Sequence, residues 1–147
     1  MSIRRMKGVP IPPCNEGHDP VVSILLAHPD IDPNLKRKFG WTPFITACYY
    51  GRTSCVRLLL RDQRVMVNEP DKLETPLCWA ASRGHLDIIK LWIASGREMN
   101  LGKPGDISKT DAIGGAKEQG ETEVVTLLGR FKEHPEETRH AMRVGLG

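Results

Sequence analysis

Two stretches of this chain repeat one another at an interval of 33 residues. Residues 40–51 align with residues 73–84, so that the Thr-Pro pair of the first stretch corresponds to the Thr-Pro pair of the second, and a glycine ends each. A constant interval of roughly 20–50 residues is typical of proteins built by stacking copies of one small unit. The repeat therefore limits the possible folds before any single element is considered.

Each copy predicts a short helix, a glycine turn and a second helix. The threonine hydroxyl caps a helix N-terminus, and the proline after it suits the first helical position, where no N–H is required. Gly51 and Gly84 follow about two turns later, where a glycine with positive φ ends a helix without steric cost. One helix pair cannot bury its apolar side alone, so the units must stack. The residues expected on that side are Phe44, Ala47, Cys48, Val56, Leu59 and Leu60 in the first copy, and Ile89, Trp92 and Ile93 in the second.

The two copies resemble the ankyrin repeat family. The resemblance rests on residues 42–44, 75–81 and 84–89, and on the loop pairs Val67-Asn68 and Met99-Asn100. It implies an all-α fold, an ankyrin-type α-solenoid of stacked helix-turn-helix units joined by hairpin-like loops. It also implies a non-catalytic protein-binding role, because members of the family bind other proteins.

The copies depart from the family pattern at three positions. Ile45 and Cys78 stand where the family usually has histidine, and Leu73 stands where it usually has glycine. The histidine normally ties the loop together by hydrogen bonding. We therefore expect the loop before Thr75 to be looser or differently turned.

The repeat pattern extends beyond the two clear copies in weaker form. Prolines in the first residues disfavour a regular helix there, so the first unit lacks its first helix. In the fourth unit Asp111 replaces the Thr-Pro motif as the expected N-cap. The organisation predicted is an irregular lead over 1–16, a repeat domain over 17–131 with units at about 17–34, 35–68, 69–101 and 107–131, and a polar tail over 132–147 with a short helix or mobile chain.

The incomplete first unit leaves apolar side chains of the helix after Gly17 without part of their cover. Residues 1–16 are expected either to fold back over them or to leave an apolar patch. Such a patch would self-associate or pair with a missing repeat. Its residues are Val21, Val22, Leu25 and Leu26.

Bulk properties exclude several classes of protein. The 147 residues suit one domain, and a net charge of +3 is too small for a nucleic-acid-binding domain. No apolar run reaches the roughly 18–20 residues of a membrane helix, and the first residues lack the apolar core of a signal peptide. These features predict an intracellular, cytoplasmic protein without nucleic-acid or membrane partners. The basic run 36–38 is interpreted as a solvated loop.

No motif in the sequence predicts catalysis, a metal site or a cofactor. The four cysteines lack a C-x-x-C pair and the five histidines lack paired spacing, so we expect small buried thiols in a reducing compartment rather than zinc ligands. Residues 114–117 superficially resemble a phosphate loop, but no strand is predicted before them and no Ser or Thr follows. The chain is therefore predicted not to be an enzyme.

Aromatic residues gather on the surface by which the family usually meets its partners, the loop tips and the solvent side of the first helices. Tyrosine and tryptophan are favoured interface anchors. The alternative is structural: Trp41 packs on a neighbouring loop, and Tyr49 and Tyr50 shield the groove between helices. Trp79 and Trp92 are instead assigned to the core. The predicted partner-binding residues are Lys38, Phe39, Trp41, Tyr49, Tyr50, Asp71, Lys72, Glu74, Ser82 and Arg83.

Two hypotheses of function follow. In the first, the chain is a module that binds a partner protein through its concave face and loop tips. In the second, it is a structural end piece of a longer ankyrin array without a partner of its own, as the incomplete first unit indicates. The sequence names no partner for the first hypothesis.

Overall fold

The computed structural model describes residues 19–37, 40–106 and 110–146. Within these ranges the regular structure is helical: α2 (Asp19–Leu26), α3 (Pro43–Tyr50), α4 (Thr53–Arg61), α5 (Pro76–Ser82), α6 (Leu86–Ser95), α7 (Ala112–Glu118), α8 (Thr122–Glu133) and α9 (Pro135–Leu146). The expected all-α solenoid is confirmed. The predictions for residues 1–16, for Lys38 and for Phe39 lie outside the described residues.

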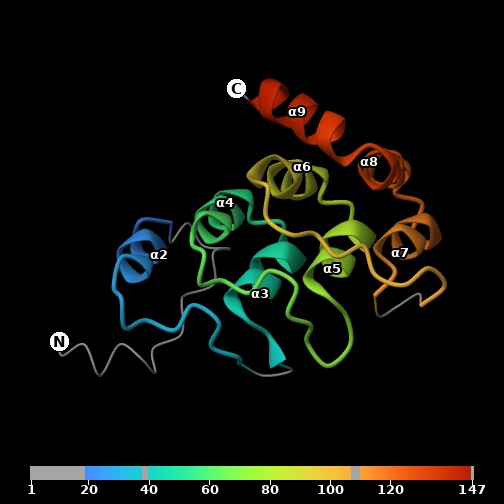
Figure 1. The fold of residues 1–147 in the computed structure, drawn as a ribbon. Coiled ribbons are helices and arrows are strands. Elements are labelled where there is room, and N and C mark those ends of the chain that lie inside the picture. The colour runs from blue at the N-terminus through green and yellow to red at the C-terminus, as the bar shows by residue number, and fades with distance from the viewer. Residues whose placement is uncertain (1–18, 38–39, 107–109, 147) are drawn as a thin grey trace.

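The helices form two layers (Figure 1). The first helices of successive units, α3, α5 and α7, lie side by side, and α2, α4, α6 and α8 form the second layer beside them. Each first helix packs against the second helix of its own unit and against the first helix of the next. We propose that α7 and α8 are a further unit, within a repeat domain of residues 17–131, because α7 packs against α5 as α5 packs against α3.

The helix starts and the glycine turns match the sequence-based expectations. The hydroxyl of Thr42 accepts a hydrogen bond from the Ile45 N–H, and that of Thr75 from the Cys78 N–H, each at 3.2 Å. Gly51 and Gly84 both have φ of +72°, as predicted. The backbone angle favours glycine at Gly84, because residues with a side chain rarely adopt a positive φ.

The core lies between the two layers and contains the expected apolar positions. Trp92 is fully buried, and its ring meets the ring of Phe44 edge to face at a centroid distance of 5.1 Å. Its Nε1–H donates to the Glu98 carbonyl at 3.1 Å, so the polar atom of this buried side chain is satisfied. The assignment of Trp79 to the core is wrong, because the Trp79 ring is only partly buried and packs against other aromatic rings outside that core.

Two arginines at equivalent positions of successive units, Arg64 after α4 and Arg97 after α6, each hydrogen-bond to the second helix of the preceding unit. The Arg64 guanidinium donates to carbonyls at the C-terminal end of α2 and beyond, those of Leu26, His28 and Ile31. Arg97 repeats this contact 33 residues later, donating to the carbonyls of Leu60 at the end of α4 and of Asp62 and Val65 beyond it. Carbonyl groups at a helix end have no partner within the helix, and the arginines supply donors to those of Leu26 and Leu60. The carbonyls of His28 and Asp62 also accept backbone N–H bonds.

Replacing Arg97 by alanine should lower the free energy of unfolding by about 1–3 kcal/mol, because partly buried carbonyls lose their donors. Urea unfolding followed by circular dichroism measures the loss. Arg130→Ala is the matched control, since Arg130 is exposed on α8 and its guanidinium donates no hydrogen bond to the described residues. Equal stabilities for the two variants would contradict the capping role.

The loops between units are also joined by repeated contacts. The Asn34 side chain bonds the Arg64 carbonyl and the Met66 N–H, both at 2.8 Å, and Asn68 bonds the Glu98 carbonyl and the Asn100 N–H in the same way. The loop before Thr75 is turned by Asp71, whose Oδ1 accepts from the N–H groups of Leu73 and Glu74 at 2.6 Å. A carboxylate thus closes the turn in a loop that lacks the family's usual glycine and histidine.

The last described helix, α9, packs against α6 and α8. Arg139 donates from Nε to the Ile93 carbonyl at 3.1 Å, and Arg143 from Nε to the Ala94 carbonyl at 2.9 Å. Arg64 and Arg97 come from the loop after a second helix and donate to carbonyls at the end of the second helix before it. At the C-terminal end of α6 the equivalent donors, Arg139 and Arg143, come from α9 instead.

The cysteines fulfil the expectation of buried thiols only in part. Cys48 and Cys78 are free and buried, whereas Cys55 is disulfide-bonded. Burial raises the pKa of the Cys48 thiol far above its ordinary value and that of Cys78 to about 11. Both therefore remain protonated near neutral pH, in the form that is a poor nucleophile.

Candidate protein-binding surface

Four aromatic side chains from two neighbouring units form one continuous aromatic cluster: Trp41, Tyr49, Tyr50 and Trp79. The Tyr49 ring is at its centre, with centroid distances of 4.8 Å to Trp41, 5.0 Å to Tyr50 and 5.0 Å to Trp79. Trp41 and Trp79 lie 6.0 Å apart. These tilted and edge-on contacts are the arrangements that aromatic pairs prefer. The cluster is open to solvent at its edge, where Tyr50 is 46% exposed.

The backbone beneath the cluster fixes where its rings stand. Trp41 immediately precedes the cap of α3, and Tyr49 and Tyr50 end the same helix, so one short rigid element sets their separation. His85 Nε2 lies 2.9 Å from the Tyr49 carbonyl oxygen and joins the end of α3 to the next unit. Trp79 donates its Nε1–H to the Asp71 carboxylate at 2.8 Å, so the ring is tied to the preceding loop.

A cation already lies on this surface. The guanidinium carbon of Arg83 stands 4.1 Å above the centroid of the Tyr49 ring. An aromatic face attracts cations through its quadrupole, and the exposed Arg83 side chain makes this contact from the end of α5. The cluster is thus suited to hold positively charged groups.

A polar hollow of about 270 Å³ adjoins the cluster between α5 and α7. Trp79 forms part of its lining, together with the carboxylates of Glu74, Asp111 and Glu118. Asp111 is occupied in capping α7, where it accepts from the Gly114 N–H at 2.8 Å. Burial, and secondarily the charge of Asp71, raise the pKa of Glu74 above its ordinary value. The lining of the hollow thus contains three carboxyl groups and one guanidinium, that of Arg83, so acidic side chains predominate there.

The structure places the predicted site residues in two groups. Trp41, Tyr49 and Tyr50 lie in the aromatic cluster, and Glu74, Ser82 and Arg83 line the hollow beside it. Asp71 joins the two through Trp79, and Lys72 is exposed on the loop tip. The structural alternative also finds support, since Trp41 does pack against the tyrosines and against Trp79 of the next unit.

Three residues of this surface are not among those predicted from the sequence: Trp79, Asp111 and Glu118. A signal for Trp79 was present, because the polar residue Thr46 occupies the equivalent position 33 residues earlier and indicates the solvent side of the helix. The two carboxylates gave no such signal. They reach the hollow from α7, about one unit further along the chain, and only the packing of α7 on α5 brings them there.

Comparison with known proteins agrees with this architecture. The sequence pattern described as ankyrin repeats in three copies matches residues 14–103, more than half of the chain. The chain belongs to the ankyrin repeat family. Members of this family are typically non-catalytic and generally serve as protein-protein interaction modules.

Individual relatives share parts of this ankyrin repeat sequence. The chain is 41% identical over 75 residues to SMC5-SMC6 complex localization factor protein 1 of Bos taurus, an alignment that covers 50% of this chain and 7% of that protein. It is 34% identical over 100 residues to the putative ankyrin repeat protein YahD of Escherichia coli (strain K12), covering 64% of this chain and 50% of that protein. The chain thus spans half or less of the length of these relatives.

Among the described residues, no group of His, Cys, Asp and Glu side chains is placed to hold a metal ion. None of the helices in the described part of the chain has the length and apolar character to cross a membrane.

Proposed function

We propose that this ankyrin repeat protein binds a partner protein through the aromatic cluster and the adjoining acidic hollow, on the face formed by α3, α5 and α7. The observation that carries the proposal is the contact of four aromatic rings across two units, with an edge open to solvent. Aromatic side chains on a rigid support are the usual anchors of protein interfaces.

The charge beside the cluster defines the partner's chemistry. Glu74 and Glu118 line the hollow, and the Tyr49 ring already holds the guanidinium of Arg83. A segment that presents lysine or arginine beside an apolar residue would place its cation near the carboxylates and its apolar group on the rings. The partner segment is therefore proposed to be basic.

Selection from a library of displayed random peptides tests this proposal without a known partner. The immobilised chain should enrich peptides with lysine or arginine next to aromatic or aliphatic residues. Against a synthetic peptide from this set, Glu74→Gln/Glu118→Gln should weaken binding about tenfold, because two attractive charges are lost. Glu123→Gln is the matched control, since Glu123 is exposed on α8 in the other layer.

The proposal also predicts how binding depends on pH. The pKa of Glu74 is raised, so its carboxylate takes up a proton at a higher pH than an ordinary glutamate and then loses its attraction for a cation. Binding should therefore weaken on acidification. Enriched peptides without basic residues, or equal affinities for the double variant and its control, would contradict a basic partner. Failure to enrich any peptide would favour the alternative, a structural piece of a longer array.

A further inference from the structure

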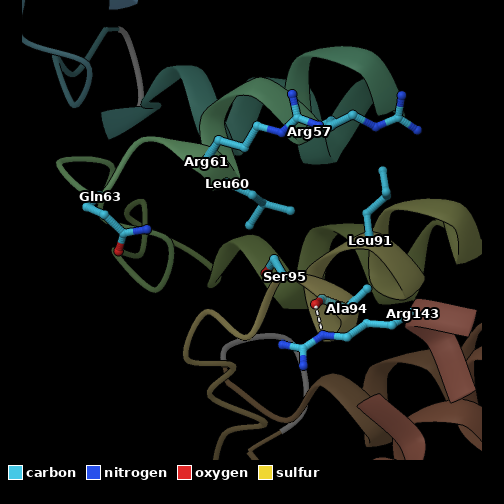
Figure 2. Close-up of a pocket in the computed structure, with 8 residues that line it drawn as sticks. All are labelled: Arg57, Leu60, Arg61, Gln63, Leu91, Ala94, Ser95 and Arg143. Carbon is cyan, nitrogen blue, oxygen red and sulfur yellow. Dashed lines mark hydrogen bonds between the residues drawn. The ribbon is translucent and has the colours of Figure 1, made fainter. Parts of the chain in front are cut away.

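A second hollow lies on the opposite layer, between α4 and α6, and has the opposite charge. Its volume is about 510 Å³, and three of its lining residues are arginines: Arg57, Arg61 and Arg143. Figure 2 shows Leu60 and Leu91 reaching into the space between the two helices, with Arg143 beside Ala94 on the side away from α4. Its lining residues include no aspartate or glutamate among the described residues. An apolar floor is thus surrounded by cations.

Two of these arginines have no side-chain partner among the described residues. The side chains of Arg57 and Arg61 are exposed, and within the described part of the chain neither guanidinium donates a hydrogen bond or forms an ion pair. They stand four residues apart on α4, a spacing at which two like charges repel. The helix C-terminus favours a cation at Arg61, in the last turn, but gives no reason for Arg57 one turn earlier.

The third arginine is held in place by the fold. Arg143 comes from α9, more than 80 residues after Arg61, and donates from Nε to the Ala94 carbonyl at 2.9 Å. This bond uses one of its five N–H donors and leaves the planar end of the guanidinium available to a carboxylate. The docking of α9 thus completes the rim of the hollow opposite α4.

We propose that the hollow between α4 and α6 binds an acidic peptide segment, with an apolar side chain on Leu60 and Leu91 and carboxylates paired to Arg57, Arg61 and Arg143. Charge complementarity selects this occupant, because three cations line a site that contains no acid among the described residues. Nucleic acid is disfavoured by the apolar floor and by a net charge of only +3. The proposal is independent of the basic partner proposed for the other layer.

Fluorescence polarisation with designed probes tests this site. The first probe is a labelled twelve-residue peptide of alternating Glu-Glu and Leu-Leu pairs; the second replaces each leucine by serine, and the third each glutamate by glutamine. The full chain should bind the first probe at least about tenfold more tightly than either of the others, because the site needs both charge and apolar contact. Equal binding of the serine probe would overturn the proposal in favour of nonspecific anion binding.

Charge reversal locates the site. Arg57→Glu/Arg61→Glu should weaken binding of the first probe at least about tenfold, because attraction becomes repulsion. Both residues are exposed, so the thermal melt should change little, and Lys132→Glu, at an exposed position on α8, is the control for a charge reversal outside the hollow. Equal weakening by Lys132→Glu, displacement of the probe by a short DNA duplex at similar concentration, or self-association of the parent in sedimentation that the double variant abolishes, would each overturn the proposal.

Discussion

Replacing Trp92 by alanine should lower the free energy of unfolding by about 3–5 kcal/mol. The side chain is fully buried between the layers, where it meets Phe44 and donates to the Glu98 carbonyl. Alanine would leave a cavity, and the Glu98 carbonyl would keep only its hydrogen bond from Asn68. In a linear stack each unit depends on its neighbours, so the loss should also be felt in α4 and α8, which pack against α6. Urea unfolding measures the change.

Trp79→Ala is the matched control for this prediction. The same side chain is removed, but Trp79 is only partly buried and lies in the aromatic cluster. It should therefore cost less stability than Trp92→Ala. A loss below about 1 kcal/mol for Trp92→Ala, or a larger loss for Trp79→Ala, would show that the burial of the two tryptophans is assigned wrongly.

Replacing Trp41 by alanine should weaken binding of the partner by about 2 kcal/mol or more, which is roughly thirtyfold. The Trp41 ring contacts three other rings of the aromatic cluster, so its removal disorganises the surface as well as deleting an anchor. Tyr50→Ala should act in the same direction, because Tyr50 forms the exposed edge. Titration calorimetry with a selected basic peptide measures both effects.

Folding and binding must be separated in these variants. Thermal melts should show that Trp41→Ala and Tyr50→Ala are folded at the binding temperature, and Ile24→Ala provides a control because Ile24 is 63% exposed on α2. If both variants melt far below the parent and still bind the peptide with parental affinity when folded, the aromatic cluster is structural. The binding face would then lie elsewhere.

The parts of the fold that the sequence predicted are those that depend on neighbouring residues. Thr42 and Thr75 cap helices through N–H groups three residues ahead, and Gly51 adopts positive φ because the chain reverses there. Such local rules act wherever the motif occurs. The interval of 33 residues then placed the same elements again in the next unit. Stacking followed, since each helix pair leaves one side apolar.

The parts that the sequence did not predict depend on contacts between distant residues. The sequence predicts a core position for Trp79 because its place on the helix is expected to face a neighbour, whereas its ring lies among Trp41 and Tyr49 of the preceding unit. The acidic hollow needs Glu118 to be brought beside Glu74 by packing of α7 on α5. The role of the aromatic cluster in binding remains a prediction from both sequence and structure.

The docking of α9 has a consequence for how the stack comes apart. A simple row of repeats loses order by fraying from both ends, since an end unit has one neighbour instead of two. Here α9 follows α8 directly in the chain but packs on α6 (Figure 1). Arg139 and Arg143 of α9 donate hydrogen bonds to backbone carbonyls of α6. Opening α7 and α8 therefore also requires α9 to detach from α6 in the preceding unit. Unfolding should therefore begin at α2, because its main contact among the described helices is with α4 alone. The amide hydrogens of α2 should exchange with solvent before those of α8.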